Sequence, residues 1–168
     1  MTRKDRFWQD LKSGKFVSMV KESSKGQRLS NSSEVYNIMK PLFSQNPDVE
    51  SLYCIFLDSK NRIIAIEKMF SGSINSSPVY PREIVKKVLA LSATALVVVV
   101  HNHPSGSCEP SSDDRSITMK IGIALASIDA KLHDHMIIGN GYHSMADDGW
   151  LAKVSEKFKY HLLQPWEV

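Results

Sequence analysis

The 168-residue chain has few cysteines, no long apolar run and no strong excess of either charge. Its two cysteines, Cys54 and Cys108, are too few for a disulfide framework. No apolar stretch approaches the roughly 20 residues that cross a bilayer, and the polar N-terminus is unlike a signal peptide, so we expect a cytoplasmic protein without a membrane-spanning segment. Lysine and arginine (21) exceed aspartate and glutamate (18) by only three, whereas a dedicated nucleic-acid binder usually shows a concentrated basic stripe.

Positive charge is nevertheless crowded near the N-terminus. The basic residues of this segment are Arg3, Lys4, Arg6, Lys12, Lys15, Lys21, Lys25 and Arg28. We predict that residues 1–30 form a basic, partly ordered arm and that residues 31–168 form one metal-binding domain, which is long enough to bury a core. A solvated arm is the simpler interpretation of the charge, and weak contact with nucleic acid is the alternative.

The most informative segment is a run of four valines that leads into two histidines. Residues 97–100 are typical of a strand buried on both faces. His101 and His103 alternate at its end, so both imidazoles should leave the same side of the chain. Seven residues separate His103 from Ser111, and Asp114 lies one helical turn further on. Two imidazole nitrogens and one carboxylate would make a three-ligand site with an open fourth position, which is typical of a catalytic zinc centre.

The same loop also has a purely structural interpretation. Ser111-x-x-Asp114 precedes apolar residues at helical spacing, so it resembles a helix N-cap with an acidic residue in the first turn. Both interpretations can hold together, with Asp114 fixed by the helix start and its carboxylate turned to the metal. Cys108 lies in the same loop and is expected to be a bystander thiol, a contact with the metal being the alternative.

Strand-like and helix-like segments alternate along the chain. The expected strands lie at 52–57, 63–70, 95–100, 131–138 and 142–145. The expected helices lie at 35–43, 81–89, 112–128 and 150–160. Asn31 with Glu34 resembles a capping box, and Pro81 suits the first position of a helix. The inward-facing residues expected in that helix are Ile84, Val85, Val88 and Leu89. This order predicts an α/β fold with a central mixed sheet flanked by helices.

Hydrolysis at such a centre also needs a proton acceptor. Zinc lowers the pKa of a bound water to about 7, and a nearby carboxylate completes its activation. Upstream of the histidines the candidates are Glu50, Glu67 and Glu83. Glu67 lies within an expected strand, and Glu83 lies in a first helical turn, where a carboxylate suits the helix dipole without any catalysis.

The spacing His-x-His, seven residues, Ser, two residues, Asp resembles the metal signature of the JAMM (MPN-plus) metalloproteases. The segment His101–Gly106 with Pro110-Ser111 is similar to the RadC-like bacterial branch of that family. Further similar segments are Phe56-Leu57-Asp58 with Asn61-Arg62, Gly72-Ser73, Val79–Glu83, Asp134-His135 with Ile137-Ile138, and Ser144. The resemblance runs from about Asn31 to Leu151.

This resemblance implies a JAB/MPN-like (cytidine-deaminase-like) architecture and a set of roles. It implies Zn²⁺ held by His101, His103 and Asp114. It makes Glu50 the general base, with Glu67 as the alternative, and Ser111 the donor to the oxyanion. Spacing does not assign Asp134 and His135. Their two interpretations are a partner to a ligating imidazole and a buried structural pair.

Two functions from different classes follow. The first is a zinc-dependent hydrolase, a peptidase or isopeptidase that acts on an unidentified peptide or protein. The alternative is a protein associated with DNA repair or recombination whose pocket binds metal without proteolysis. RadC-like proteins usually carry an N-terminal domain resembling helix-hairpin-helix DNA-binding modules. The first 30 residues are too few to hold it, so we expect a weaker link to DNA for this chain.

Overall fold

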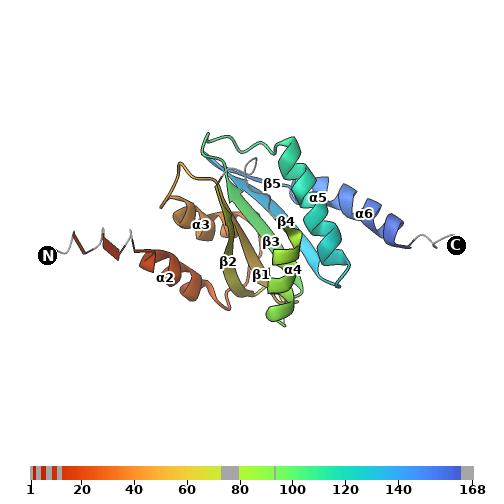
Figure 1. Ribbon diagram of the computed structural model, residues 1–168, viewed down its shortest axis with the longest axis horizontal. Coiled ribbons are helices and arrows are strands. Elements are labelled where there is room, and N and C mark those ends of the chain that lie inside the picture. Colours follow the sequence, from red (N-terminus) through yellow and green to blue (C-terminus); the bar gives the residue numbers. More distant parts are fainter. Residues whose placement is uncertain are drawn as a thin grey trace.

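A mixed five-stranded sheet forms the centre of the molecule (Figure 1). The computed structural model describes residues 2, 5, 6, 9, 10, 13–72, 80–92 and 94–163, with side chains up to residue 156. Within them the strand order is β2-β1-β3-β4-β5. The strands are β1 (Ser51–Leu57), β2 (Ile63–Ser71), β3 (Leu96–Asn102), β4 (Lys131–Ile138) and β5 (Tyr142–Ser144). Only β3 and β4 pair in parallel, and the other neighbours are antiparallel. The predicted α/β fold with a central mixed sheet is therefore confirmed.

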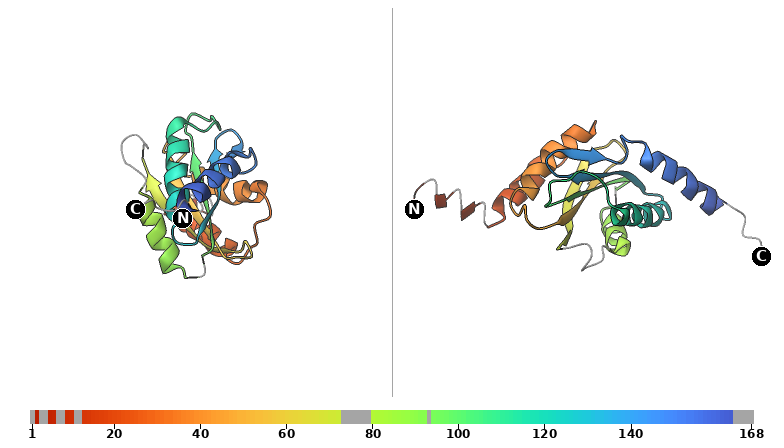
Figure 2. Two further views of the ribbon diagram at one scale, coloured as in Figure 1. Left: turned by 90° about the vertical axis from the view of Figure 1, so that its right-hand side faces the viewer. Right: turned by 90° about the horizontal axis from the view of Figure 1, so that it is seen from above.

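Helices cover both faces of this sheet (Figure 2). α2 (Lys15–Ser24) and α3 (Ser32–Phe43) lie on one face, and α4 (Pro81–Ala90) and α5 (Ser112–Ala126) lie on the other. The last helix, α6 (Trp150–Leu163), contacts α5 and extends away from the sheet (Figure 2). Side chains of β1 alternate between two buried clusters because successive residues of a strand point to opposite faces. Tyr53 and Ile55 pack in the cluster that α3 covers, whereas Leu52 and Cys54 pack in the cluster that α4 and α5 cover. The valines of β3 complete both clusters, so the strand that leads to the histidines is anchored from two sides.

The N-terminal ends of α3 and α4 lie where the predicted capping box and the proline place them. The Asn31 side chain accepts a hydrogen bond from the Glu34 amide at 2.9 Å, and Glu34 accepts one from the Ser30 amide at 2.7 Å. Pro81 is the first residue of α4.

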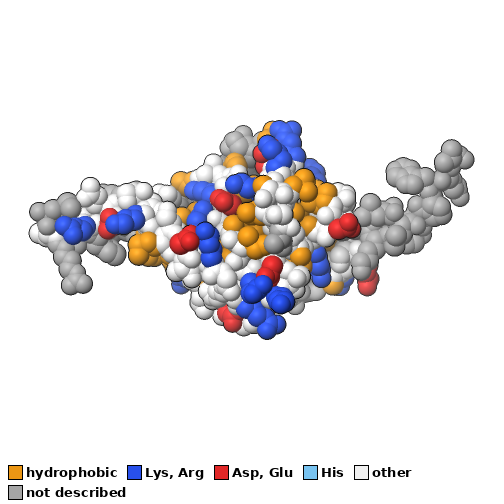
Figure 3. Space-filling view, turned by 90° about the horizontal axis from the view of Figure 1, so that it is seen from below, with side chains coloured by type: hydrophobic (Ala, Val, Ile, Leu, Met, Phe, Trp, Pro, Cys, Tyr) orange, Lys and Arg blue, Asp and Glu red, His pale blue; other side chains and the backbone are white. Residues whose placement is uncertain are grey.

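The prediction that Leu89 faces inward is wrong, since this side chain is 65% exposed. Val88 is buried, and the next residue lies roughly 100° further around the helix. Hydrophobic side chains are visible among charged ones on the lower face of the molecule, where α4 lies in Figure 1 (Figure 3).

Part of the predicted N-terminal arm is helical and packs on the domain. Val17 and Val20 of α2 contact the cluster on the α3 side, and Leu29 is buried in it. Lysines of this segment lie beside carboxylates, in the pairs Lys15–Asp10 (3.4 Å), Lys25–Glu22 (2.8 Å) and Lys21–Glu67 (3.9 Å). The boundary at residue 30 stays a prediction. No helix in the described part of the chain combines the length and apolar character needed to cross a membrane.

Candidate metal centre

Three elements meet at the end of the central strands. His101 is near the end of β3, His103 follows that strand, and Asp114 lies in the first turn of α5. Antiparallel pairing places Leu52 of β1 opposite His101. The residue two positions before Leu52, Glu50, therefore lies towards His103. Two adjacent strand ends and one helix start thus deliver four polar side chains to one place.

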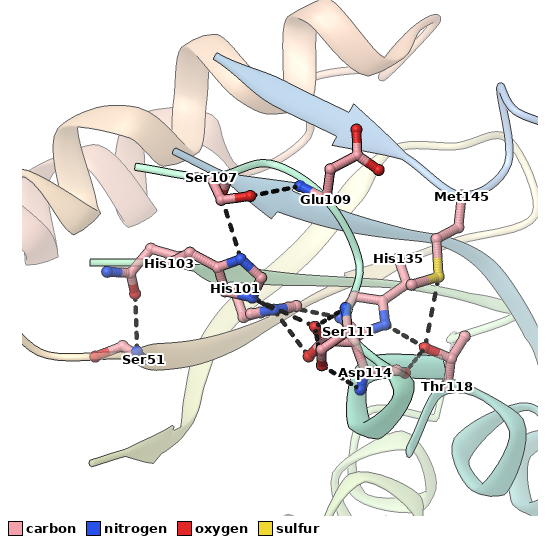
Figure 4. A network of polar contacts seen from close by, with 11 residues as sticks. Ser51, His101, His103, Ser107, Glu109, Ser111, Asp114, Thr118, His135 and Met145 are labelled. Carbon is pink, nitrogen blue, oxygen red and sulfur yellow. Dashed lines mark hydrogen bonds and ion pairs between the residues drawn. The ribbon is translucent and has the colours of Figure 1, made fainter. Parts of the chain in front are cut away.

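The side chains predicted from the motif are in contact (Figure 4). His101 Nε2 lies 2.9 Å from His103 Nε2 and 3.0 Å from Asp114 Oδ1. His103 Nε2 lies 3.3 Å from Asp114 Oδ2. Glu50 also offers a carboxylate oxygen that lies within 4.8 Å of ligand atoms of both histidines. His101 and Asp114 are buried, while His103 and Glu50 are partly exposed, so solvent reaches the site at His103 and Glu50.

Close contact shifts the pKa values of Asp114 and His103 in opposite directions. Burial by itself would raise the pKa of Asp114, but hydrogen bonds with His101 and His103 hold that pKa well below its usual range. The hydrogen bond with Asp114 raises the pKa of His103, and the charges of Asp114 and Glu50 add to this. Both shifts have one physical cause: an ionised carboxylate sits against two imidazoles in a place with little water.

Two imidazole nitrogens and a carboxylate oxygen in mutual contact fit a metal ion. An Nε2 atom without hydrogen and a carboxylate oxygen each present a lone pair, and lone pairs this close repel unless a proton or a cation lies between them. Imidazole nitrogen and carboxylate oxygen are ligands that Zn²⁺ accepts. The residues present therefore fit the metal that the sequence pattern predicts.

A second set of contacts holds the far side of the His101 ring. His101 Nδ1 lies 2.8 Å from His135 Nε2, and the other ring nitrogen of His135 contacts the hydroxyl of Thr118. His135 and His101 have no exposed surface, and Thr118 is 1% exposed. Burial lowers the pKa of His135 well below that of a free imidazole, so this ring is neutral near pH 7. Sequence reasoning left two interpretations of His135 open, a partner to a ligating imidazole and a buried structural pair with Asp134, and it missed Thr118, whose position four residues after Asp114 was an available signal.

Ser111 is the N-cap of α5, as one sequence interpretation predicts. Its hydroxyl accepts from the Asp114 amide at 3.1 Å and donates to Asp114 Oδ2 at 2.6 Å. The Ser111 amide also donates to Oδ2, at 2.8 Å. The capping box therefore engages Oδ2 of this carboxylate, while Oδ1 faces His101. The helix start and the orientation of Asp114 towards the histidines coexist.

The other predicted candidates lie elsewhere. Glu67 in β2 contacts Lys21 and Lys87 (3.9 and 3.7 Å), and Glu83 contacts Lys86 at 3.1 Å. Cys108 is half-buried in the motif loop and is not part of the group formed by Glu50 and the histidines. Among the glutamates considered, Glu50 is the one that the structure brings to the site.

Asp134 has a structural role on the other face of β4. Its carboxylate accepts from the Ser144 hydroxyl at 2.6 Å and from the Ala146 amide at 2.9 Å. These bonds hold the turn between β5 and α6. Asp134 and His135 are neighbours in sequence, but their side chains contact different groups because adjacent strand residues face opposite sides of the sheet.

Asn102, which sequence reasoning passed over, ties the two strand ends together. Its side-chain oxygen accepts from the Ser51 amide at 2.8 Å, and its side-chain nitrogen donates to the Val49 carbonyl at 3.2 Å. These two backbone groups flank Glu50. The residue between the two histidines therefore holds the segment that carries the candidate base.

Comparison with known proteins gives one consistent family. The model of the RadC-like JAB domain matches residues 29–150. A UPF0758 protein of Ectopseudomonas mendocina is 50% identical over 99 residues, 58% of this chain and 44% of the relative. One of Pseudomonas fluorescens is 44% identical over 124 residues (73% and 54%), and one of Legionella pneumophila is 42% identical over 139 residues (82% and 59%).

This chain thus spans about half the length of the curated relatives it matches. The matched residues contain the sheet, His101 near the end of β3, His103 just after that strand and the capped start of α5. The chain belongs to the family of RadC-like JAB domains.

Proposed function

We propose that the chain is a cytoplasmic zinc-dependent hydrolase that cleaves a peptide or isopeptide bond. His101, His103 and Asp114 would hold the metal, Glu50 would be the general base, and Ser111 would stabilise the oxyanion. The observation that carries the proposal is the convergence of two imidazole Nε2 atoms and a buried carboxylate within 3.3 Å, with Glu50 beside them at the solvent-accessible side.

Each residue has a distinct part in this chemistry. A bound zinc ion would supply Lewis-acid polarisation and lower the pKa of a water molecule to about 7. The Glu50 carboxylate would accept the proton of the attacking water and return it to the leaving group. The Ser111 hydroxyl would donate to the developing negative charge, and to do so it must exchange its present bond to Asp114 Oδ2.

Metal analysis of the purified protein is the first test. We expect about one zinc per chain in the wild type and none after the double substitution His101→Ala, His103→Ala. The fold should persist, because the valines of β3 pack in both clusters. Stoichiometric zinc in the folded double variant would refute the site.

Two matched substitutions separate the base from the ligands. Glu50→Gln should keep the zinc and abolish cleavage in an unbiased peptide-library screen, because an amide cannot accept the proton. Glu67→Gln is the control and should change neither property. Asp114→Ala should lose zinc, and loss of zinc in Glu50→Gln instead would make Glu50 a ligand.

The alternative is a protein associated with DNA repair or recombination whose pocket binds metal without proteolysis, and the basic N-terminal residues are the feature that favours it. Three lysines there lie beside carboxylates, so we expect weak, non-specific binding. Binding through phosphate contacts should fall steeply with added salt because counterions are released. Deletion of residues 1–28 should remove this binding, and tight, sequence-selective binding that persists both after the deletion and at about 200 mM salt would favour the alternative.

A further inference from the structure

Three buried side chains from three elements form a continuous row behind the metal centre. Thr118 of α5 contacts His135 Nδ1 of β4, and His135 Nε2 lies 2.8 Å from His101 Nδ1 of β3 (Figure 4). None of the three side chains is more than 1% exposed. Water therefore cannot serve as a partner for these atoms, and the direction of each hydrogen bond follows from the protein groups alone.

The Thr118 hydroxyl determines which atom donates the hydrogen bond between Thr118 and His135. It has a single hydrogen, and it lies against the backbone carbonyl of Asp114 and, more distantly (3.6 Å), the sulfur of Met145. Both of these atoms can only accept. Once the hydroxyl donates to either, its oxygen is left to accept, and the hydrogen of the remaining contact must come from His135 Nδ1.

The tautomer of His135 then determines which atom donates the hydrogen bond between His135 and His101. A neutral imidazole with hydrogen on Nδ1 presents a lone pair at Nε2. That lone pair accepts from His101 Nδ1, so the hydrogen of this second contact belongs to His101. The Nε2 atom of His101 is then the nitrogen left to face His103 and Asp114.

We propose that His135, oriented by Thr118, is a positioning residue that keeps the hydrogen of His101 on Nδ1 and so directs the Nε2 lone pair to the metal. This inference rests on the metal centre proposed above. His103 reaches the same state in another way, because its Nδ1 lies 3.2 Å from the carbonyl of Ser107, which can only accept. The Ser107 carbonyl therefore fixes the tautomer of His103 without a further group. His135 fixes the tautomer of His101 only while Thr118 fixes the tautomer of His135 itself.

Through α5, these contacts also connect two of the proposed metal ligands, Asp114 and His101. Asp114 and Thr118 are one turn apart on α5, so the same turn supplies a carboxylate to the site and the hydroxyl that orients His101 through His135. Groups that hold the second nitrogen of a ligating histidine typically change metal affinity by about 10- to 100-fold when removed.

Two pairs of variants test this role. His135→Leu removes the acceptor, whereas His135→Gln can place an amide oxygen near the position of Nε2 and keep accepting. Thr118→Val removes the hydroxyl at nearly constant volume, whereas Thr118→Ser retains it. His133→Leu is the matched control, since it makes the same change two residues earlier in β4 on an exposed side chain.

The first measurement is zinc affinity by competition with a chromophoric chelator, with circular dichroism to verify folding. We expect a loss of about 10- to 100-fold for His135→Leu and Thr118→Val, and recovery to within about threefold of wild type for His135→Gln and Thr118→Ser. The control His133→Leu should bind zinc as wild type does. Wild-type affinity in folded His135→Leu would overturn the proposal, as would equal losses in all five variants.

The second measurement reads the tautomer directly and needs no metal. In ¹⁵N-labelled, metal-free wild-type protein, NMR should show hydrogen on Nδ1 of both His101 and His135. A neutral His101 with hydrogen only on Nε2 would overturn the proposal even if every variant loses zinc. Absence of zinc binding by the wild type would refute the proposed function instead, and the NMR result would still decide the role of His135.

Discussion

Adjacent residues of β4 show how one physical cause acts on two kinds of side chain. Burial raises the pKa of Asp134 and lowers that of His135, since in both cases it disfavours the charged form. For Asp134 the hydrogen bonds from Ser144 and Ala146 oppose the shift without cancelling it. The carboxylate therefore holds the turn after β5 at an electrostatic cost that depends on pH.

This cost predicts a pH dependence of stability. The folded-state pKa of Asp134 lies above its ordinary value of 3.8, so the folded chain binds this proton more tightly than the unfolded chain. The stabilising contribution is complete below 3.8 and is lost as the pH rises through the folded-state pKa. The free energy of unfolding of wild type should therefore fall relative to that of Asp134→Asn over this range. Denaturant titrations at several pH values measure it, and parallel curves for the two proteins would contradict it.

At the scale of elements, the start of α5 combines a helix cap with the metal centre. Ser111 and Asn31 are both N-caps whose side chains accept an amide hydrogen three residues on, in α5 and α3 respectively. Only Ser111 also donates to a carboxylate of the site. The two caps therefore form a natural matched pair.

We expect Ser111→Ala and Asn31→Ala to lower the free energy of unfolding by a similar amount, about 0.5–2 kcal/mol each. Only Ser111→Ala should also weaken zinc binding, because Asp114 loses the hydroxyl that orients Oδ2. Denaturant unfolding and chelator competition measure the two effects. An equal change in zinc affinity for both variants would show that Ser111 acts on the site through helix stability alone.

The loop that carries the second histidine is held by the turn between β4 and β5. The His103 amide donates to the Ile138 carbonyl at 2.8 Å, and the Asn140 amide donates to the Gly106 carbonyl at 2.9 Å. A Cβ at Gly139 would lie 2.3 Å from the carbonyl oxygen of Gly106, which is backbone and cannot swing away. This glycine therefore permits the close approach of loop and turn.

Gly139→Ala should displace the motif loop, destabilise the protein by about 1–3 kcal/mol and reduce zinc affinity. Gly141→Ala is the control, since a Cβ there meets no atom within 4 Å. Thermal unfolding and zinc titration of both variants test the prediction. Unchanged zinc affinity in Gly139→Ala would mean that His103 keeps its place without this packing.

At the scale of the whole molecule, the buried core predicts a fold that does not depend on the metal centre. The two buried clusters lie on opposite faces of the sheet, and the candidate ligands lie at the strand ends beyond them. Small zinc domains that unfold without metal lack such cores. Here the metal would add stability to a chain that is already folded.

Removal of zinc by a chelator should therefore leave the far-ultraviolet circular dichroism unchanged and lower the unfolding temperature. A ligand at 100 times its dissociation constant stabilises the folded state by about 2.7 kcal/mol. For a domain of this size that corresponds to a shift of several degrees, on the order of 2–4 °C per kcal/mol. Loss of the folded signal on chelation would show instead that the metal is structural.

Much of this protein could be predicted from sequence because its strongest signals are local. Strand alternation, helix caps, and the spacing of His101, His103 and Asp114 depend on residues near one another in the chain. The α/β fold, the family and the approach of those three side chains accordingly agree with the pattern. Leu89 was misplaced because helical spacing alone cannot show how wide a face the neighbouring elements cover.

Only the tertiary structure decided which distant residues complete the site. Glu50 and Glu67 were both candidates by sequence, and the antiparallel register of β1 with β3 brings Glu50 to the histidines while β2 holds Glu67 against lysines. His135 reaches His101 across 34 positions of chain because β4 pairs in parallel with β3. Strand register is a cooperative property of the folded sheet. The sequence therefore determines the chemistry of each side chain, and strand pairing determines which distant side chains it contacts.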